Sequence, residues 1–185
     1  MCEDYVDLRA AIYDDEGEKG RFRQLVVNSV MATDIMDKDL KNDRNARWSK
    51  AFTDHPEEDL SADVVNRKAT IVIEHLIQAS DVAHTMQHWH IYRKWNERLF
   101  SELYKSYVEG RSATDPTEFW YKGELGFFDF YIIPLAKKLS ECGVFGVSSD
   151  EYLNYALKNR GEWERTGREV VEKLKAKVTV QEEAE

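Results

Sequence analysis

The sequence predicts an all-α fold, and three observations support that class. Apolar residues recur at steps of three and four through most of the chain, which is the spacing of one helix face. No segment shows the apolar-polar alternation that is typical of a half-buried strand. Only three prolines and nine glycines interrupt 185 residues, so long helices with few tight turns are expected. The predicted architecture is a compact multi-helix bundle of about six or seven helices.

The amino-terminal part is expected to contain one short and one long helix. Residues 4–14 predict the short helix, with Leu8 and Ile12 on one side, and the following stretch DDEGEKG predicts a break. Residues 21–39 predict the longer helix, in which apolar and small residues recur at steps of three and four from Phe22 onward.

A polar loop is expected at residues 53–64, TDHPEEDLSADV, because this stretch contains a proline and many charged residues. Ser61 or Asp63 would cap the next helix, since either side chain accepts a hydrogen bond from an N–H group of the first turn. That helix has an apolar face that includes Ile71, and it is expected to end within residues 81–85.

Three further helices are expected in the rest of the chain. The first covers residues 88–108 and has a stripe that repeats every fourth residue: Ile91, Trp95, Leu99, Leu103 and Tyr107. Residues 119–142 predict an apolar helix that Pro134 kinks, because proline has no N–H group for the helical hydrogen bond. The last helix is expected over residues 150–177.

The composition narrows the functional classes. The formal net charge is −9, from 26 lysines and arginines against 35 aspartates and glutamates. An acidic chain is a poor candidate for binding a nucleic acid polymer, although a phosphate-containing substrate stays compatible when metal ions supply positive charge. Cys2 and Cys142 lie far apart, and the sequence contains no recognisable signal peptide or membrane span. A cytoplasmic protein is expected, and attachment to a membrane through parts outside this chain is the alternative.

One segment gathers potential metal ligands: QASDVAHTMQHWHIYRKWNERLF, residues 78–100. If Asp81, His84 and His88 lay on one helix, they would share a face. The two histidines, four residues apart, would then be able to reach one ion. An ordinary solvated helix face has the same pattern, so the spacing alone does not decide between a metal site and a polar surface.

Two further stretches give this segment a context: VVNSVMATDI before it and YKGELGFFDFYIIPL after it. In this order and with these separations, the three stretches resemble the catalytic domain of the class I 3′,5′-cyclic nucleotide phosphodiesterases. The middle stretch aligns without a gap from Asp81 to Arg98, and Asp129 and Pro134 match the last motif. The resemblance covers roughly residues 5–170.

The resemblance implies an all-helical domain that hydrolyses cyclic AMP or cyclic GMP in signal transduction. It implies two divalent metal ions, zinc and either magnesium or manganese. Asp81 matches a metal ligand, and its carboxylate is the kind of group that such ions require. Asp34 matches an aspartate near the water shell of the second ion. For each aspartate, an ordinary polar helix position is the alternative.

Three residues match positions that contact the nucleotide. Phe127 matches the aromatic ring that stacks on the base, and a core aromatic is the alternative. Glu124 replaces the family's base-reading glutamine; an ionised glutamate only accepts hydrogen bonds, which suits guanine, and a protonated one would regain a donor for adenine. His84 replaces the usual asparagine and titrates near neutral pH. Trp95 is expected in the core beneath this site.

Part of the family pattern does not occur in the sequence, namely the upstream motifs HNxxH and HDxxHxG. In the family these supply the general-acid histidine and further metal ligands, so no catalytic residue is expected here. Residues 1–172 are expected to be the carboxy-terminal part of a catalytic domain, followed by an acidic tail at residues 173–185. Activity would then need a partner chain or a missing amino-terminal half. The alternatives are a non-catalytic module that binds a nucleotide or a partner, and an unrelated helical scaffold.

Overall fold

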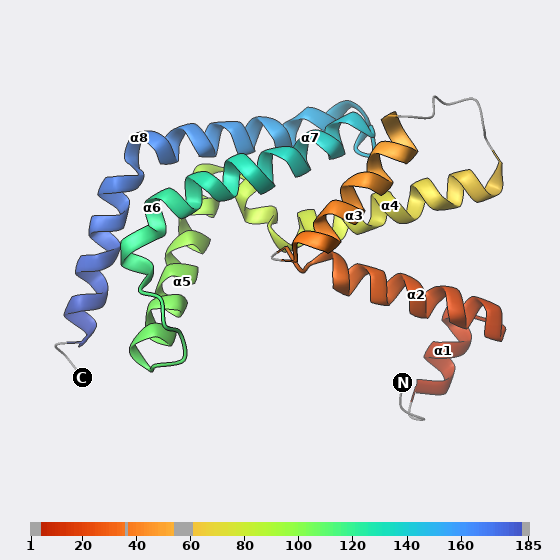
Figure 1. Ribbon diagram of the computed structural model, residues 1–185, viewed down its shortest axis with the longest axis horizontal. Helices are drawn as coiled ribbons and strands as arrows, with labels where there is room; N and C mark the ends of the chain where they lie inside the picture. Colours follow the sequence, from red (N-terminus) through yellow and green to blue (C-terminus); the bar gives the residue numbers. More distant parts are fainter. Residues whose placement is uncertain (1–4, 36, 54–60, 183–185) are drawn as a thin grey trace. The chain divides into compact units, whose positions relative to one another are not determined.

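The computed structural model describes residues 5–35, 37–53 and 61–182, and every regular element in these residues is helical (Figure 1). The all-α prediction is therefore confirmed. The chain divides into two compact units, Met1–Asp81 and Val82–Glu185. Each unit has its own helices and its own buried side chains.

The described part of the first unit contains α1 (Val6–Ile12), α2 (Glu16–Ala32), α3 (Lys38–Trp48), a π-helical segment (Ser49–Thr53) and α4 (Ala62–Asp81). Both α2 and α3 pack against α4. Most of the expected loop falls on residues 54–60, which lie outside the described residues. The helix α4 begins at Ala62, directly after Ser61.

The helix α2 begins inside the stretch where the glycines predict a break, so that prediction is wrong for residues 16–20. Asp15 explains the start, because its side chain accepts a 2.8 Å hydrogen bond from the N–H group of Glu18. Gly17 and Gly20 each weaken a helix by roughly 1 kcal/mol. The cap and the acidic side chains of the first turn offset part of that cost.

The single helix predicted for residues 21–39 is two helices in the structure. The helix α2 ends at Ala32, and Asp37 caps α3 by accepting hydrogen bonds of 2.9 and 3.0 Å from two N–H groups of its first turn. No apolar pattern predicts α3, because Arg44 and Trp48 are the residues that it buries. The N-cap residue Asp37 thus starts a new helix within a stretch whose pattern predicts one continuous helix.

The second unit contains the 3₁₀ segment η3 (Ala83–Met86), α5 (Trp89–Val108), α6 (Pro116–Phe127), the π-helical segment η4 (Phe128–Ile132), α7 (Ile133–Glu141), the 3₁₀ segment η5 (Gly146–Ser148) and α8 (Ser149–Glu182). Figure 1 shows α8 running along α7 and α6 before it bends and continues beside α5. This packing buries the large side chains of Phe128 and Trp163. The other helices of the unit therefore pack against α8.

The segments α6, η4 and α7 form one helical run, as predicted for residues 119–142. The kink predicted at Pro134 takes the form of the π-helical turn η4 just before it. Proline lacks an N–H group and its ring clashes with the carbonyl four residues earlier, so a widened turn accommodates it. The run begins earlier than predicted, at Pro116, because Asp115 accepts a 2.8 Å hydrogen bond from an N–H group of the first turn.

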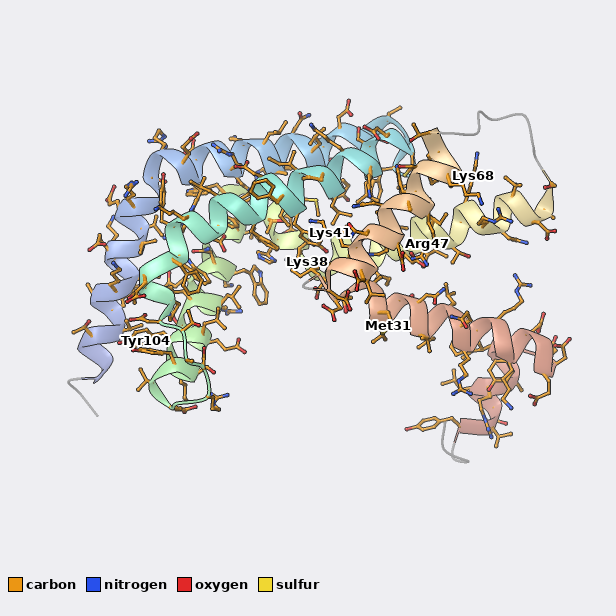
Figure 2. All side chains as sticks on the ribbon, in the orientation of Figure 1. Met31, Lys38, Lys41, Arg47, Lys68 and Tyr104 are labelled. Atoms are coloured by element: carbon orange, nitrogen blue, oxygen red, sulfur yellow. The ribbon has the colours of Figure 1, made fainter. Side chains whose placement is uncertain are left out.

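The buried face of α5 is not the face that the apolar pattern predicts. Tyr92, Asn96 and Phe100 are buried, and Tyr104, labelled in Figure 2, stacks on Phe100 with 6.2 Å between ring centroids. Four side chains of the predicted stripe are between 36 and 48% exposed, and Ile91 is half-buried. We call the four exposed residues the α5 row: Trp95, Leu99, Leu103 and Tyr107. The expectation that Trp95 lies in the core is therefore wrong. The polar Asn96 occupies the buried face because it finds hydrogen-bond partners there.

The helix α8 continues to Glu182, so the boundary expected at residue 172 falls inside a helix. Leu174 and Val178 are buried, which shows that the core of the second unit extends past that boundary. None of the described helices is long and apolar enough to cross a membrane.

Candidate functional site

The second unit holds a partly buried carboxylate at the position of the expected base-reading residue. Glu124 lies on α6, and its Oε2 atom accepts a 2.6 Å hydrogen bond from the hydroxyl group of Tyr92 on α5. Tyr92 is only 1% exposed, so this contact is shielded from water and electrostatically strong. The contact joins α5 to α6 at the candidate site.

Two more side chains extend this contact into a chain of hydrogen bonds. Asn96 Nδ2 lies 3.4 Å from the hydroxyl oxygen of Tyr92, and Trp120 Nε1 lies 3.3 Å from Asn96 Oδ1. An indole N–H only donates, so the amide oxygen of Asn96 accepts and its amide nitrogen donates to Tyr92. Tyr92 in turn donates to Glu124. Glu124 is thus the acceptor at the end of a chain with a fixed direction.

The surroundings shift the acid-base behaviour of this pair. Burial raises the pKa of Glu124 above its usual value of 4.5, although hydrogen bonds from Tyr92 and Asn96 act in the opposite direction. Burial and the neighbouring Glu124 carboxylate raise the pKa of Tyr92 well above 10.0. Tyr92 therefore stays a donor at neutral pH, and Glu124 is the member of the pair that changes its proton content.

Phe127 is the last residue of α6 and follows Glu124 by three positions, so the two residues share a helix face. The half-buried ring of Phe127 stacks on Tyr131, with 5.4 Å between centroids and 19° between planes. The structure thus brings Glu124 and Phe127 together within one helical turn. The contact of Phe127 with Tyr131 is the kind that a core aromatic residue makes. Stacking of Phe127 on a base stays a prediction.

His84 lies outside the long helices, in the 3₁₀ segment η3, with its ring centroid 6.3 Å from that of Trp95. The helix α4 ends at Asp81 and α5 starts after His88, so the hypothesis that residues 81, 84 and 88 share one helix face is wrong. His88 is the N-cap residue of α5, and its Nε2 atom lies 3.0 Å from the hydroxyl oxygen of Tyr155 on α8.

The two aspartates that the resemblance links to metal ions lie in the first unit. Asp81 is exposed at the end of α4, and Asp34 is exposed just after α2, where its Oδ1 atom accepts a 3.2 Å hydrogen bond from the N–H group of Asp37. Among the described residues, no group of three or more histidine, cysteine, aspartate or glutamate side chains is placed to hold an ion. A catalytic zinc needs about three protein ligands. The described donors therefore do not fit the two-ion site that the resemblance implies.

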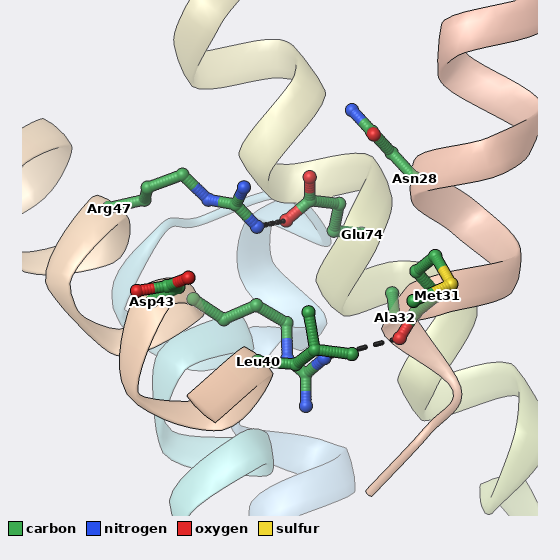
Figure 3. Close-up of a pocket in the computed structure, with 8 residues that line it drawn as sticks. Asn28, Met31, Ala32, Leu40, Asp43, Arg47 and Glu74 are labelled. Carbon is green, nitrogen blue, oxygen red and sulfur yellow. Dashed lines mark hydrogen bonds and ion pairs between the residues drawn. The ribbon is translucent and has the colours of Figure 1, made fainter. Parts of the chain in front are cut away.

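A polar pocket of about 150 Å³ lies between α2, α3 and α4 of the first unit, and Figure 3 shows the side chains that line it. Arg47 donates a 2.7 Å hydrogen bond to Glu74, which is only 3% exposed. Burial raises the pKa of Glu74, although the positive charges of Arg47 and Arg44 act in the opposite direction. The pocket thus encloses charged groups of both signs.

The end of α2 is fixed by two buried side chains from the neighbouring helices. Arg44, only 6% exposed, donates to the carbonyl oxygens of Met31 and Asp34 at 3.3 and 3.1 Å. Gln78 donates to the carbonyl oxygen of Ala32 at 3.0 Å. These bonds satisfy carbonyl groups at the helix end and hold the backbone that carries Asp34. Contacts between a side chain and a distant backbone leave no periodic signal, so the sequence does not reveal them.

The aspartate of the last motif forms a two-pronged contact with α8. Arg160 Nε lies 2.9 Å from Asp129 Oδ1, and Arg160 Nη2 lies 3.1 Å from Asp129 Oδ2. These hydrogen bonds hold the pKa of Asp129 below its usual value of 3.8. Arg160 is a further residue that the sequence patterns missed, because its partner is distant in the chain.

A comparison with models of protein families matched residues 8–145 to the family described as 3'5'-cyclic nucleotide phosphodiesterase. The matched residues include Asp34, Asp81, Glu124 and Phe127. Comparisons with curated proteins and with solved structures found no match.

Proposed function

The chain belongs to the 3'5'-cyclic nucleotide phosphodiesterase family, and we propose that it serves the hydrolysis of cyclic AMP or cyclic GMP in cytoplasmic signal transduction. In this reaction water adds to the phosphorus of the cyclic phosphate. The bond from phosphorus to O3′ breaks, O3′ takes up a proton, and the 5′-monophosphate is released. The match over residues 8–145 supports this proposal.

One observation carries the proposed nucleotide pocket, namely the chain of hydrogen bonds that ends on Glu124 beside Phe127. Oε2 of the carboxylate accepts from Tyr92, and we propose that the carboxylate also accepts hydrogen bonds from the base. Phe127 offers an aromatic face one turn away, and base-aromatic stacking contributes about 1–3 kcal/mol. We assign base reading to Glu124 and base stacking to Phe127, with His84 as a further contact.

The charge of Glu124 sets the proposed choice of base. An ionised carboxylate accepts hydrogen bonds from the N1–H and N2–H groups of guanine, whereas adenine presents the lone pair of N1 to it. A protonated carboxyl group would donate to that lone pair. We therefore propose that cyclic GMP is preferred while Glu124 is ionised, and that cyclic AMP gains relative affinity as Glu124 takes up a proton.

The proposed metal dependence involves Asp81 as one ligand of a zinc ion, and Asp34 near the water shell of a magnesium or manganese ion. The described donors do not complete such a site. We propose that the other ligands come from a partner chain or from further polypeptide. The alternative function is a non-catalytic module that binds a nucleotide or a partner, and the exposed α5 row favours it.

A binding and turnover assay separates these functions. The purified chain is titrated with fluorescent analogues of cyclic GMP and cyclic AMP, and hydrolysis is then followed with Zn²⁺ and Mg²⁺ present. Binding that Phe127→Ala weakens supports the pocket, and Phe119→Ala, at an exposed position of the same helix, is the matched control. Turnover supports the enzyme, and binding without turnover supports the non-catalytic nucleotide-binding module. No binding at millimolar concentrations rejects the proposed nucleotide pocket.

A further inference from the structure

We propose that Asn159 and Arg160, neighbours on α8, are positioning residues that hold the two segments of the proposed nucleotide pocket at a fixed separation. One segment runs through residues 82–88 and carries His84. The other is η4, which directly follows Phe127. The proposal rests on the proposed function, because it takes His84 and Phe127 as contacts of the nucleotide.

Asn159 holds the first segment through both of its amide N–H groups. Its Nδ2 atom lies 2.9 Å from the carbonyl oxygen of Thr85 and 2.7 Å from that of Gln87. Asn159 is 0% exposed, and its Oδ1 atom is buried without a hydrogen-bond partner. Only the donor half of this amide is used, so the position requires two donors rather than a polar side chain in general.

The segment around His84 depends on such donors because it lies between α4 and α5, outside a continuous helix. Side-chain donors bind three of its carbonyl groups, those of Val82, Thr85 and Gln87. The hydroxyl group of Thr85 donates to the carbonyl oxygen of Val82 at 2.7 Å, and Thr85 and Met86 are buried. The backbone that presents His84 is therefore fixed from α8 and by its own threonine.

Arg160 holds the second segment through Asp129. Asp129 lies in the π-helical turn η4, where the regular ladder of helical hydrogen bonds is interrupted. A pair of parallel N–H···O bonds from a planar guanidinium group fixes both the distance and the orientation of a carboxylate. Partly exposed ion pairs contribute little to overall stability. The geometry that this pair imposes is therefore its main effect.

Consecutive residues of a helix point about 100° apart, which follows from its 3.6 residues per turn. Asn159 and Arg160 therefore reach two different neighbours from one point on α8. Because these two residues are adjacent in the chain, they hold the His84 segment and the Phe127 segment at a fixed separation. A nucleotide that contacts both segments needs this separation, since displacements of about 1 Å in a site reduce rates by as much as 100-fold.

The test compares Asn159→Asp, which keeps the shape of the side chain but replaces its donors, with Arg160→Lys, which keeps the charge but loses the two-pronged contact. Lys177→Ala is the control, because it removes a different ion pair of α8, the one with Glu97 on α5. The first readout is the NMR resonance of the His84 ring, whose shift depends on the nearby ring of Trp95. We expect Asn159→Asp to move this resonance and Lys177→Ala to leave it in place.

The second readout is affinity for a fluorescent cyclic GMP analogue, measured on variants that still unfold cooperatively. We expect each of Asn159→Asp and Arg160→Lys to weaken binding about tenfold, and the control to bind like the wild type. Folded variants with unchanged affinity and an unchanged His84 resonance would overturn the proposal. If the wild type binds no cyclic nucleotide, the proposed function fails, and the His84 resonance alone decides the positioning role. If Asn159→Asp does not fold, Arg160→Lys carries the test through affinity.

Discussion

The hydroxyl group of Tyr92 lies 2.6 Å from Oε2 of Glu124 and links α5 to α6. Asn96 and Trp120 behind the hydroxyl group fix the direction of this hydrogen bond, so Tyr92 donates and the carboxylate accepts. The consequences of this arrangement are open to direct measurement.

Tyr92→Phe removes the donor and keeps the ring. We expect the pKa of Glu124 to rise further, because the hydrogen bond from Tyr92 lowers it. We also expect the free energy of unfolding to fall by about 1–2 kcal/mol. An NMR titration of labelled glutamate carboxyl groups and urea unfolding measure these changes. Tyr107→Phe, on the exposed α5 row, is the control. An unaltered Glu124 titration in Tyr92→Phe would contradict the assigned contact.

Glu124→Gln replaces a carboxylate by an amide, which both donates and accepts. We expect the ratio of cyclic GMP to cyclic AMP affinity at neutral pH to fall by about tenfold, since the amide accommodates either base. Competition binding with the two nucleotides measures the ratio. Glu118→Gln, at an exposed position of α6, should keep the wild-type ratio. The proposed base-reading role is wrong if both variants behave alike.

The stability of the protein should depend on pH through two glutamates, the buried Glu74 and the partly buried Glu124. Burial raises the pKa values of Glu74 and Glu124 above 4.5, so the native state binds their protons more tightly than the unfolded chain does. Their contribution is fully present below about pH 4.5 and is lost as the pH rises through the raised native values. Glu74→Gln and Glu124→Gln should each flatten this loss in urea unfolding at a series of pH values. The exposed Glu151→Gln should leave the slope unchanged, and a steeper slope in either buried variant would count against the assignment.

Replacing two glycines of α8 by alanine should change the free energy of unfolding in opposite directions. A Cβ atom at Gly167 would lie 2.9 Å from two ring atoms of Trp163 and 3.0 Å from the ring of Tyr121. Gly167→Ala should therefore lower the free energy of unfolding by about 1–3 kcal/mol. A Cβ atom at Gly161 would meet no atom of another part of the chain within 4 Å. Gly161→Ala should therefore raise the free energy of unfolding by about 0.5–1 kcal/mol. Thermal or urea unfolding of the two variants checks this, and equal stabilities would show that the close packing of α8 is not rigid.

Metal binding by the chain alone should be weak. Asp81 is exposed, and no group of three ligands is assembled among the described residues. We expect calorimetric titration with Zn²⁺ to give no tight site, Asp81→Asn to titrate like the wild type, and hydrolysis to be slight. A tight site that Asp81→Asn abolishes would show that ligands beyond the described ones come together.

The sequence predicted those features that depend on local patterns. Pro134 predicted a kink in the helix, and the structure has a π-helical turn just before this proline. The apolar helix predicted for residues 119–142 is present, and Glu124 and Phe127 lie in its part α6. The helical class itself followed from periodicity, which long amphipathic helices preserve.

The features that it missed depend on contacts between distant residues. The buried face of α5 includes Asn96, which is stable there only because Trp120 and Tyr92 complete its hydrogen bonds. A pattern that counts apolar residues therefore selects the wrong face. Arg44 and Asn159 likewise hold backbone carbonyl groups far away in the chain. Such partners are fixed by tertiary packing and have no characteristic spacing.

The α5 row should also influence how the protein behaves in concentrated solution. Molecules with a net charge of −9 repel one another, and this keeps the exposed rings and leucines of neighbouring molecules apart at low ionic strength. Added salt shortens the reach of that repulsion to about 8 Å at 0.15 M, while the attraction between apolar surfaces persists. The protein should therefore stay monodisperse in dilute buffer and self-associate along α5 as the salt concentration rises, which is the reverse of an assembly held by ion pairs.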